Sequence, residues 1–290
     1  MVNKESNSIK KTALAATLAM LFTANVQAAF TFTPKANNKV GLYLGGQTWQ
    51  SEASGILGEK NTLIDFNLKK EQQNNFFVAI VHPYPLLPNV RISSTTIATT
   101  GRANLTQVFS FGDETFLIDT DANANFNVSY LDYTLYYGLF DNDLFSFDLG
   151  LSARDFNGAV IITGQTIIDY DDCLQTSQGN PCPSTSTSSS VTPTGKIKTD
   201  EIVPMLYAAT NISLPLTGLS LFAQGDFSLI DDHSLFDYQV GLNYNLAYIS
   251  KMDFNLALGY RVMKIEFEDL HNLDTDLEFK GAFVGVIVHF

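Results

Sequence analysis

Strict two-residue alternation of apolar and polar side chains runs through the second half of the chain and constrains its fold more than any other feature. Successive side chains of a β-strand point to opposite faces of a sheet, so this period predicts strands rather than helices. Residues 145–154, 236–246 and 253–262 show it most clearly. Each segment has about the 9–11 residues that a tilted strand needs to cross a bilayer.

Alternation by itself fits both a soluble β-sandwich and a membrane β-barrel, since either can have one apolar and one polar face. The expected strands exceed the ~5–6 residues usual in a sandwich. Aromatic residues lie toward the ends of the apolar face, as in the girdles of membrane barrels, and the other face mixes Gly with Asp, Asn, Gln and Arg. We therefore expect an all-β, antiparallel transmembrane barrel, with the secreted sandwich as the alternative.

The composition agrees with a wall that faces lipid. Hydrophobic residues make up 45% of the 290 residues and charged residues only 16%, below the roughly 25% of soluble domains. The 22 Phe and 12 Tyr argue against disorder, and the net charge of −13 argues against a nucleic-acid partner. No segment has the ~18 continuous apolar residues of a spanning helix.

The first residues have the order of a secretory signal. A polar stretch with lysines is followed by an apolar run over 13–24 and then by Val26-Gln27-Ala28, which has small or branched residues at the positions that a signal peptidase inspects. We predict a signal peptide over 1–28, cleaved after Ala28, then a short periplasmic segment over 29–39 and the barrel domain over 40–290. A membrane anchor is the alternative, but about 12 apolar residues span only ~18 Å of helix.

Ten strands are expected, and an even number lets both ends of the barrel lie on the periplasmic side. Long connections over 51–74, 100–125 and 169–200 are then outer loops, and the others are short. The first three strands alternate less well, so an eight-stranded barrel with an N-terminal insert is the alternative. The expected strands span 40–50, 75–82, 89–99, 126–140, 144–168, 201–214, 218–229, 234–246, 252–267 and 277–290.

The chain ends on an alternating apolar face that includes Val286, Val288 and Phe290. This ending resembles the C-terminal signal by which barrels of the Gram-negative outer membrane are recognised for assembly. The resemblance implies that the barrel-assembly machinery is a partner during biogenesis.

Two N-terminal motifs add a more specific resemblance: a Gly-Gly pair in the first strand and a His-Pro-x-Pro-Leu-Leu-Pro-Asn turn after the second. With the terminal Phe, they make the whole mature chain resemble the GlyGly-type family of outer-membrane β-barrel proteins. That family implies a barrel in the outer membrane of a Gram-negative bacterium and brings no established activity. Physically, the prolines predict a rigid turn and the glycines permit close packing. The motif residues are Gly45, Gly46, His82, Pro83, Pro85 and Pro88.

Cys173 and Cys182 are the two cysteines, and both lie in the third long connection. In an exported protein such a pair predicts a disulfide that closes a small loop. Zinc would need further ligands, and the segment from 169 to 199 has no His. Free thiols are the remaining alternative.

One acidic segment has the ligand types of a calcium site. Asp119, Asp121 and Asn123 are spaced like the start of a calcium loop, but Ala124 and Tyr130 occupy the positions that require Gly and Glu. We expect a solvated loop and no bound metal there.

Asp231, Asp232 and His233 place carboxylates beside an imidazole at an outer turn, the minimum for activating water, and invite comparison with the omptin proteases. Three adjacent residues of one turn do not converge on a substrate, so no catalytic residue and no cofactor is assigned.

The polar face predicts a charged network inside the barrel. An Arg facing lipid would cost about 2–4 kcal/mol at the midplane, so both Arg side chains on these strands are placed inside. Filling a narrow lumen with ion pairs leaves little room for a general porin. The network is expected to join Arg154 and Arg261 to Asp148, Asp237 and Asp253, with Asp132 and Asp226 also within reach.

These features together predict a monomeric outer-membrane barrel, in contact with lipid, that has a structural or surface-contact role and no evident catalysis. A narrow channel or carrier for small solutes or lipids is one alternative. A hydrolase acting at the extracellular rim is the other.

Overall fold

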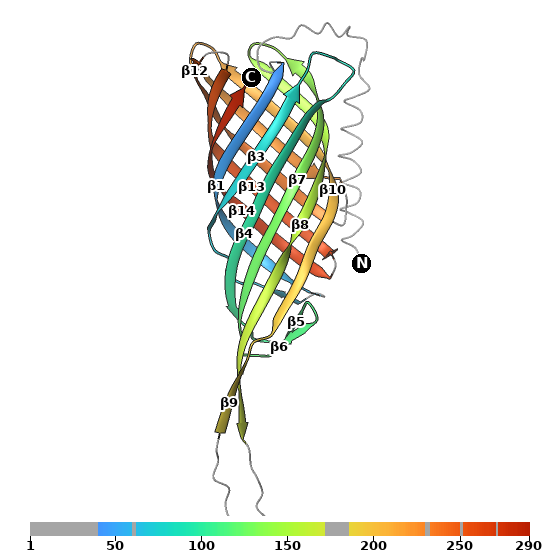
Figure 1. Ribbon diagram of the computed structural model, residues 1–290, viewed down its shortest axis with the longest axis vertical. Helices are drawn as coiled ribbons and strands as arrows, with labels where there is room; N and C mark the ends of the chain where they lie inside the picture. The colour runs from blue at the N-terminus through green and yellow to red at the C-terminus, as the bar shows by residue number, and fades with distance from the viewer. Residues whose placement is uncertain (1–39, 60–61, 172–185, 230–232, 250–251, 271) are drawn as a thin grey trace, which may run out of the picture. The chain divides into compact units, whose positions relative to one another are not determined.

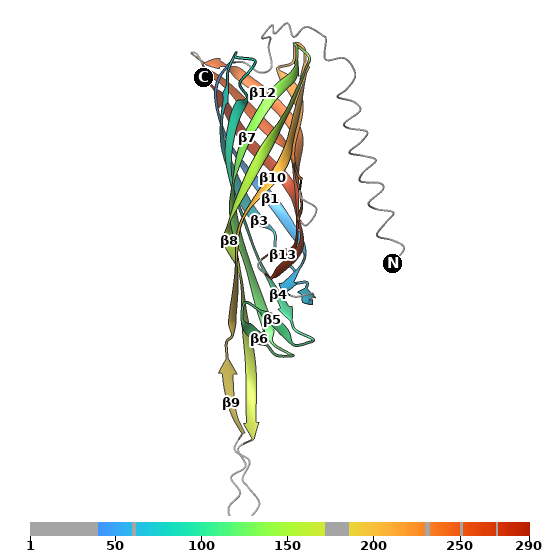
Figure 2. The same cartoon turned by 90° about the vertical axis from the view of Figure 1, so that its right-hand side faces the viewer.

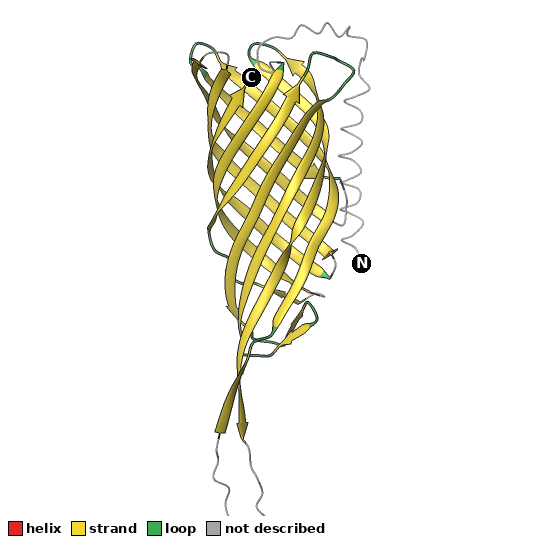
Figure 3. Cartoon of the chain, viewed as in Figure 1, coloured by secondary structure: helices red, strands yellow, loops and turns green. Residues whose placement is uncertain are grey.

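The computed structural model describes residues 40–59, 62–171, 186–229, 233–249, 252–270 and 272–290. The expected signal peptide, both cysteines, Asp231 and Asp232 lie outside these ranges. The described residues of the C-terminal unit form a closed, antiparallel, ten-stranded barrel, which confirms the predicted fold class (Figure 1; Figure 3). No helix in this part of the chain is long and apolar enough to cross a membrane.

Each barrel strand pairs with its neighbour along the chain, and the last pairs with the first. Each of the ten expected strands corresponds to one observed strand, so the eight-stranded alternative is wrong. The barrel strands are β1 (Gly41–Glu59), β3 (Glu71–Val81), β4 (Asn89–Asn104), β7 (Asp121–Asp141), β8 (Phe145–Asp171), β10 (Thr194–Leu214), β11 (Leu219–Ser228), β12 (His233–Ile249), β13 (Met252–Leu270) and β14 (Leu273–His289).

Four further strands lie outside the barrel wall: β2 (Thr62–Ile64), the hairpin of β5 (Phe109–Phe111) and β6 (Glu114–Phe116), and β9 (Ser186–Val191). β9 pairs with the distal part of β8, and Figure 2 shows the two continuing beyond the barrel as a ribbon. These strands interrupt the long connections, which all leave the same end of the barrel.

Several strands run further into the expected long loops than the sequence indicated. β1 extends from the expected end at 50 to Glu59, and its pairing with β14 continues through Glu52 opposite Lys280. β7 begins at Asp121 rather than at 126. At these points the outward face changes from apolar to polar while the backbone pairing continues. A strand end predicted from the apolar face alone therefore falls before the true end of the strand.

β7 shows this change of face most clearly. Toward the short turns, its outward side chains are Leu131, Tyr133, Leu135, Tyr137 and Leu139, and the inward ones are Asp132, Thr134 and Tyr136. Toward the long loops, the outward side chains are Asn123, Asn125, Asn127 and Ser129, and the inward ones are Ala122, Ala124, Phe126 and Val128. We call the two parts of the barrel the belt half and the loop half.

The belt half is a transmembrane segment. Its outward surface consists of large apolar side chains that are well exposed, such as Leu151 at 61% and Leu258 at 58%. A continuous apolar surface of this kind is unfavourable in water and matches the lipid-facing band of membrane barrels. On β14 the band begins at Ala282, directly after the outward charged residues Asp274, Asp276, Glu278 and Lys280.

The loop half has an apolar core in place of a water-filled lumen. Phe126 packs on Phe279 with ring centroids 5.8 Å apart, and Phe156 packs on Phe267 at 5.6 Å. All four rings are buried, and each contributes about 1.5–3 kcal/mol by leaving water.

An aromatic lid continues this core at the long-loop end. It consists of Phe66, from the connection after β2, with Phe109, Phe111 and Phe116 of the β5–β6 hairpin, all fully buried. Phe109 lies at the centre, 5.9 Å from Phe111 and Phe116 and 6.3 Å from Phe66 between ring centroids. The lid and the core together fill the loop half.

Candidate functional site

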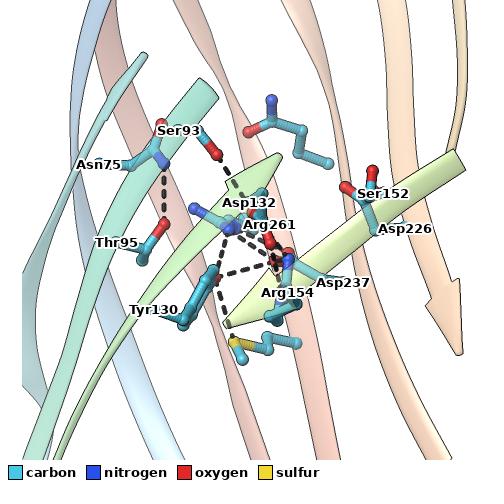
Figure 4. Close-up of polar contacts among 12 residues, drawn as sticks. Asn75, Ser93, Thr95, Tyr130, Asp132, Ser152, Arg154, Asp226, Asp237 and Arg261 are labelled. Atoms are coloured by element: carbon cyan, nitrogen blue, oxygen red, sulfur yellow. Dashed lines mark hydrogen bonds and ion pairs between the residues drawn. The ribbon is translucent and has the colours of Figure 1, made fainter. Parts of the chain in front are cut away.

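Four charged side chains and a tyrosine meet in the lumen where the belt half joins the loop half, and Figure 4 shows their contacts. Tyr130 and Asp132 come from β7, Arg154 from β8, Asp237 from β12 and Arg261 from β13. All five side chains point into the lumen. Residues that are an even number of positions apart in a strand share one face, and each of these five is separated in this way from other inward residues of its own strand. We call these five residues the charged layer.

Arg154 joins two carboxylates on opposite sides of the lumen. Its Nε donates to Asp132 Oδ1 at 2.7 Å, and its Nη2 donates to Asp132 Oδ2 at 3.1 Å and to Asp237 Oδ2 at 2.9 Å. The guanidinium also lies over the ring of Tyr130, 4.0 Å from its centroid. With 1% of its surface exposed, Arg154 is held by ion pairs rather than by water.

Arg261 completes the layer from the other side. Its Nε and Nη2 form a bidentate pair with Asp237, at 2.8 Å to Oδ1 and 2.7 Å to Oδ2. Nη2 also donates to the hydroxyl of Tyr130 at 2.9 Å, and that hydroxyl donates to Asp237 Oδ2 at 3.0 Å. Trp49 lies under the guanidinium, 5.1 Å from its ring centroid.

Two arginines and two aspartates give the charged layer a net charge of zero. Buried charges need this pairing, because a buried charge without a partner is strongly destabilising. Every carboxylate oxygen of Asp132 and Asp237 accepts at least one hydrogen bond, including one from Ser93 to Asp132 at 3.1 Å. The geometry is that of a structural crosslink, with both acids committed to arginines.

The structure brings together three members of the predicted network, Arg154, Arg261 and Asp237. It places the other two elsewhere. Oδ2 of Asp253 lies 3.5 Å from Nδ1 of His289 near the short turns, and Asp148 lines the cavity described below. Both lie on the predicted face but at a different height along the barrel. Asp226 accepts a hydrogen bond from Ser152 at 2.8 Å beside the layer.

Tyr130 belongs to the charged layer, although the sequence pattern did not predict it as a member. Its signal in the sequence is its position on the inward face of β7, between apolar Val128 and polar Asp132. A residue at the change from an apolar to a polar lumen needs both an apolar body and a polar tip, which Tyr supplies.

A cavity of about 420 Å³ opens at the short-turn end of the lumen. The hydrogen bond from Gln47 Nε2 on β1 to Gln239 Oε1 on β12, 3.1 Å long, crosses the lumen at its inner end. Beyond this bond a void of about 20 Å³ adjoins the charged layer, with room for about one water molecule. Within the described residues the cavity therefore ends blindly.

The glycine pair packs against aromatic rings. Gly45 lies opposite Phe77 and Gly46 opposite Phe76 in the pairing of β1 with β3. A Cβ at Gly45 would lie 2.0 Å from the Phe77 ring, so that ring occupies the space of the missing side chain. This arrangement covers a strand glycine with a cross-strand aromatic.

The His-Pro motif forms the short turn between β3 and β4, and His82 braces it. Nδ1 of His82 accepts a hydrogen bond from the backbone N–H of Tyr84 at 3.2 Å, so Nε2 carries the proton and donates to the carbonyl of Pro88 at 3.0 Å. The prolines at 83, 85 and 88 limit the turn further. In this geometry His82 is a structural residue.

The acidic segment with the calcium-like spacing, Asp119 to Asn123, is held by an ion pair. Asp121 Oδ2 accepts a 2.6 Å hydrogen bond from Arg102 on the neighbouring strand, and this bond holds the pKa of the Asp121 carboxyl below its usual range. Asp119 lies in the turn before β7 with a φ of 63°, and Asn123 faces outward. His233 begins β12, next to Asp231 and Asp232, which lie outside the described residues.

No protein-family model matches the chain, and no curated protein matches it. Among solved structures, it is similar to the outer-membrane protease OmpT of Escherichia coli, with 7% identity, a TM-score of 0.48 and coverage of 89% of this chain and 99% of that one.

Two further solved structures are similar. The transport unit of the Escherichia coli autotransporter AIDA-I has 10% identity, a TM-score of 0.34 and coverage of 89% and 93%. An outer-membrane channel of Pseudomonas putida F1 has 9% identity, a TM-score of 0.33 and coverage of 89% and 100%. At these identities and TM-scores, the three similarities assign neither a family nor an activity.

Proposed function

We propose that this protein is a monomeric integral protein of the outer membrane of a Gram-negative bacterium, with a structural or surface-contact role and no catalysis of its own. One observation carries the proposal: the lumen is filled from the charged layer to the aromatic lid. A filled lumen leaves no aqueous path for general diffusion. It makes the barrel a rigid support for the segments at its long-loop end.

The orientation follows the usual arrangement of outer-membrane barrels, with short turns in the periplasm and long loops outside. Both ends of the described barrel, Val40 and Phe290, lie at the short-turn end. Export would require the signal peptide predicted over 1–28. Phe290 and Val286 face outward and are exposed, so the assembly machinery could reach them on the barrel surface. The resemblance to the GlyGly-type family remains part of this proposal.

The ribbon of β8 and β9 is the segment best placed for surface contact. Residues 166–171 pair with 186–191, and the pairing ends with Asp171 opposite Ser186. Because Asp171 and Ser186 are paired, the connection over 172–185 begins and ends at neighbouring positions of the ribbon. We therefore propose that Cys173 and Cys182 form a disulfide near the tip, which peptide mass spectrometry with and without reductant would detect.

Deletion of residues 166–191 tests the surface role while leaving the barrel intact. Thr163 pairs with Thr194, and the N–H of Gly164 donates to the carbonyl of Pro193 at 2.9 Å. The deletion leaves Gln165 and Thr192 as a two-residue turn beyond this pair. We expect unchanged amounts in the outer-membrane fraction and loss of adhesion of whole cells to a coated surface.

Three results would contradict the proposal. Recovery of the mature protein in a detergent-free soluble extract would exclude a membrane protein. Steady conductance in planar bilayers would favour the channel alternative. Loss of a surface protease or lipid-modifying activity in Asp232→Ala or His233→Ala would favour the hydrolase alternative.

A further inference from the structure

The cavity at the short-turn end has the size of a small-molecule site and is open on one side. Its volume of about 420 Å³ lies within the ~300–1,000 Å³ of small-molecule pockets. The Gln47–Gln239 hydrogen bond and the charged layer close its inner end, so a molecule can enter and leave only past the short turns. The proposed surface role uses the opposite end of the barrel and does not explain this cavity.

The wall of the cavity is rich in carboxamides and aromatic rings. A carboxamide carries both a donor and an acceptor without net charge, which matches a hydroxyl group that both donates and accepts. Aromatic rings add flat apolar faces. A sugar ring presents the complementary surface, since it has hydroxyls at its edge and C–H groups on its faces. The carboxamides at the cavity include Asn211, Gln224, Asn243 and Asn255, and the rings include Tyr136 and Tyr207.

One part of the wall combines both features. Phe222 of β11 lies opposite Asn211 of β10 and opposite Gly241 of β12, and Asn243 is the next inward residue on β12. Phe222 and both asparagines line the cavity. The sheet therefore sets an aromatic ring between two carboxamides on adjacent strands, which lie about 5 Å apart.

Both asparagines have an unused acceptor. Oδ1 of Asn211 and Oδ1 of Asn243 are buried and have no hydrogen-bond partner among the described residues. A buried acceptor without a partner costs about 1–3 kcal/mol. Rotation of each carboxamide toward the cavity would let a hydroxyl donor of a ligand supply the missing bond.

The charges at the cavity favour an uncharged ligand. Arg91 lies over the Phe77 ring, 3.6 Å from its centroid, while Asp148 and Asp253 lie at other parts of the wall. Because both signs are present, any fully charged ligand would meet a like charge as well as an opposite one. We propose that this cavity binds a neutral saccharide of one or two sugar units.

Binding would be measured on the purified full barrel in zwitterionic micelles, because maltoside detergents themselves carry a disaccharide. The probes are maltose, cellobiose and N,N′-diacetylchitobiose, with putrescine and inorganic phosphate as charged probes. Titration calorimetry and saturation-transfer NMR are expected to show saturable binding of at least one saccharide with Kd below about 1 mM.

Two variants locate the site. Asn211→Leu with Asn243→Leu keeps the side-chain size and removes the hydrogen bonds, and is expected to weaken saccharide binding at least tenfold. Ala209→Phe, which fills the cavity from the same wall, is expected to do the same and serves if the first variant does not fold. Asn125→Leu on the outward face of the loop half is the matched control and leaves Kd unchanged. Circular dichroism and thermal unfolding check the fold of each.

Three outcomes overturn the inference. The first is that none of the saccharides binds. The second is that a saccharide binds equally well to both cavity variants, so that its site lies elsewhere. The third is that putrescine or phosphate binds more tightly than every saccharide and loses affinity in the same variants, so that the ligand is charged.

Discussion

The belt half and the loop half of the barrel are built from the same strands, but their outward faces meet different surroundings, lipid in the first and water in the second. In the belt half, lipid surrounds the wall, so Leu135 faces outward and Asp132 faces the lumen. In the loop half of the same strand, Asn125 faces outward and Phe126 faces the lumen. The strand keeps its direction and its period of two, and only the surroundings change. Alternation therefore indicates that a segment is a strand, whereas the medium outside the barrel decides which of its two faces is apolar.

The charged layer marks the boundary between these halves, and removing its central residue should have the largest effect. Arg154→Met leaves the buried Asp132 with Ser93 but without its arginine, and it removes one of the two arginines that pair with Asp237. We therefore expect a loss of about 3–5 kcal/mol in unfolding free energy. Urea titration of the refolded barrel measures it. The double variant Arg154→Met with Asp132→Leu should recover at least half. A single variant as stable as the wild type would show that the layer is not an ionic crosslink.

The core of the loop half should respond like the core of a soluble protein. Phe279→Ala opens a void against Phe126, and we expect a loss of about 3–5 kcal/mol in the same titration. The matched change in the belt half is Leu151→Ala, where lipid fills the space left by the side chain. Only the transfer of the lost carbons from water to lipid is then forfeited, so the expected loss is about 2 kcal/mol or less. Equal losses at the two positions would contradict the proposed difference between the halves.

A lysine placed outward on β7 tests where the lipid ends. Leu135→Lys lies in the apolar band and should cost about 2–4 kcal/mol. Asn125→Lys lies outward in the loop half and should change stability by no more than about 0.5 kcal/mol. Thermal unfolding of both variants in lipid vesicles compares them. If Asn125→Lys costs as much as Leu135→Lys, the loop half also faces lipid.

The smallest effect is expected from a surface pair of the loop half. The Arg102 hydrogen bond lowers the pKa of Asp121 in the folded state, so its contribution to stability is present above the unfolded value of about 3.9 and is lost as the pH falls below it. Asp121→Asn should therefore reduce the acid dependence of the melting temperature by about 1 °C or less. Asp121→Asn is expected to lower the melting temperature more at pH 7 than at pH 3. A larger decrease at pH 3 than at pH 7 would contradict this prediction.

Much of the fold was predictable because the period of a strand is local. The alternation over 236–246 and 253–262 identified β12 and β13, and the even strand count followed from the spacing of the turns. The ends of β1 and β7 were not predictable in this way, because the apolar face changes sides at the boundary of the lipid while the pairing continues.

The candidate sites divide in the same manner. Parity placed Arg154, Arg261 and Asp237 on the inward face, but parity says nothing about height along the lumen, so Asp148 and Asp253 were grouped with them although they lie nearer the short turns. The contacts of Tyr130 with Arg261 and of Gln47 with Gln239 join residues more than 100 positions apart.

The sequence by itself determined the antiparallel strands of a barrel wall, the inward direction of Arg154 and Arg261 and the scarcity of charge on the wall, because each follows from side chains within one strand; the structure decided between ten strands and eight. Only the tertiary structure decided that the loop half has an apolar core beneath an aromatic lid, that the charges form one neutral layer, and that a blind cavity remains at the short-turn end. These features depend on which side chains meet across the closed barrel, and closure brings together strands that are distant in the chain.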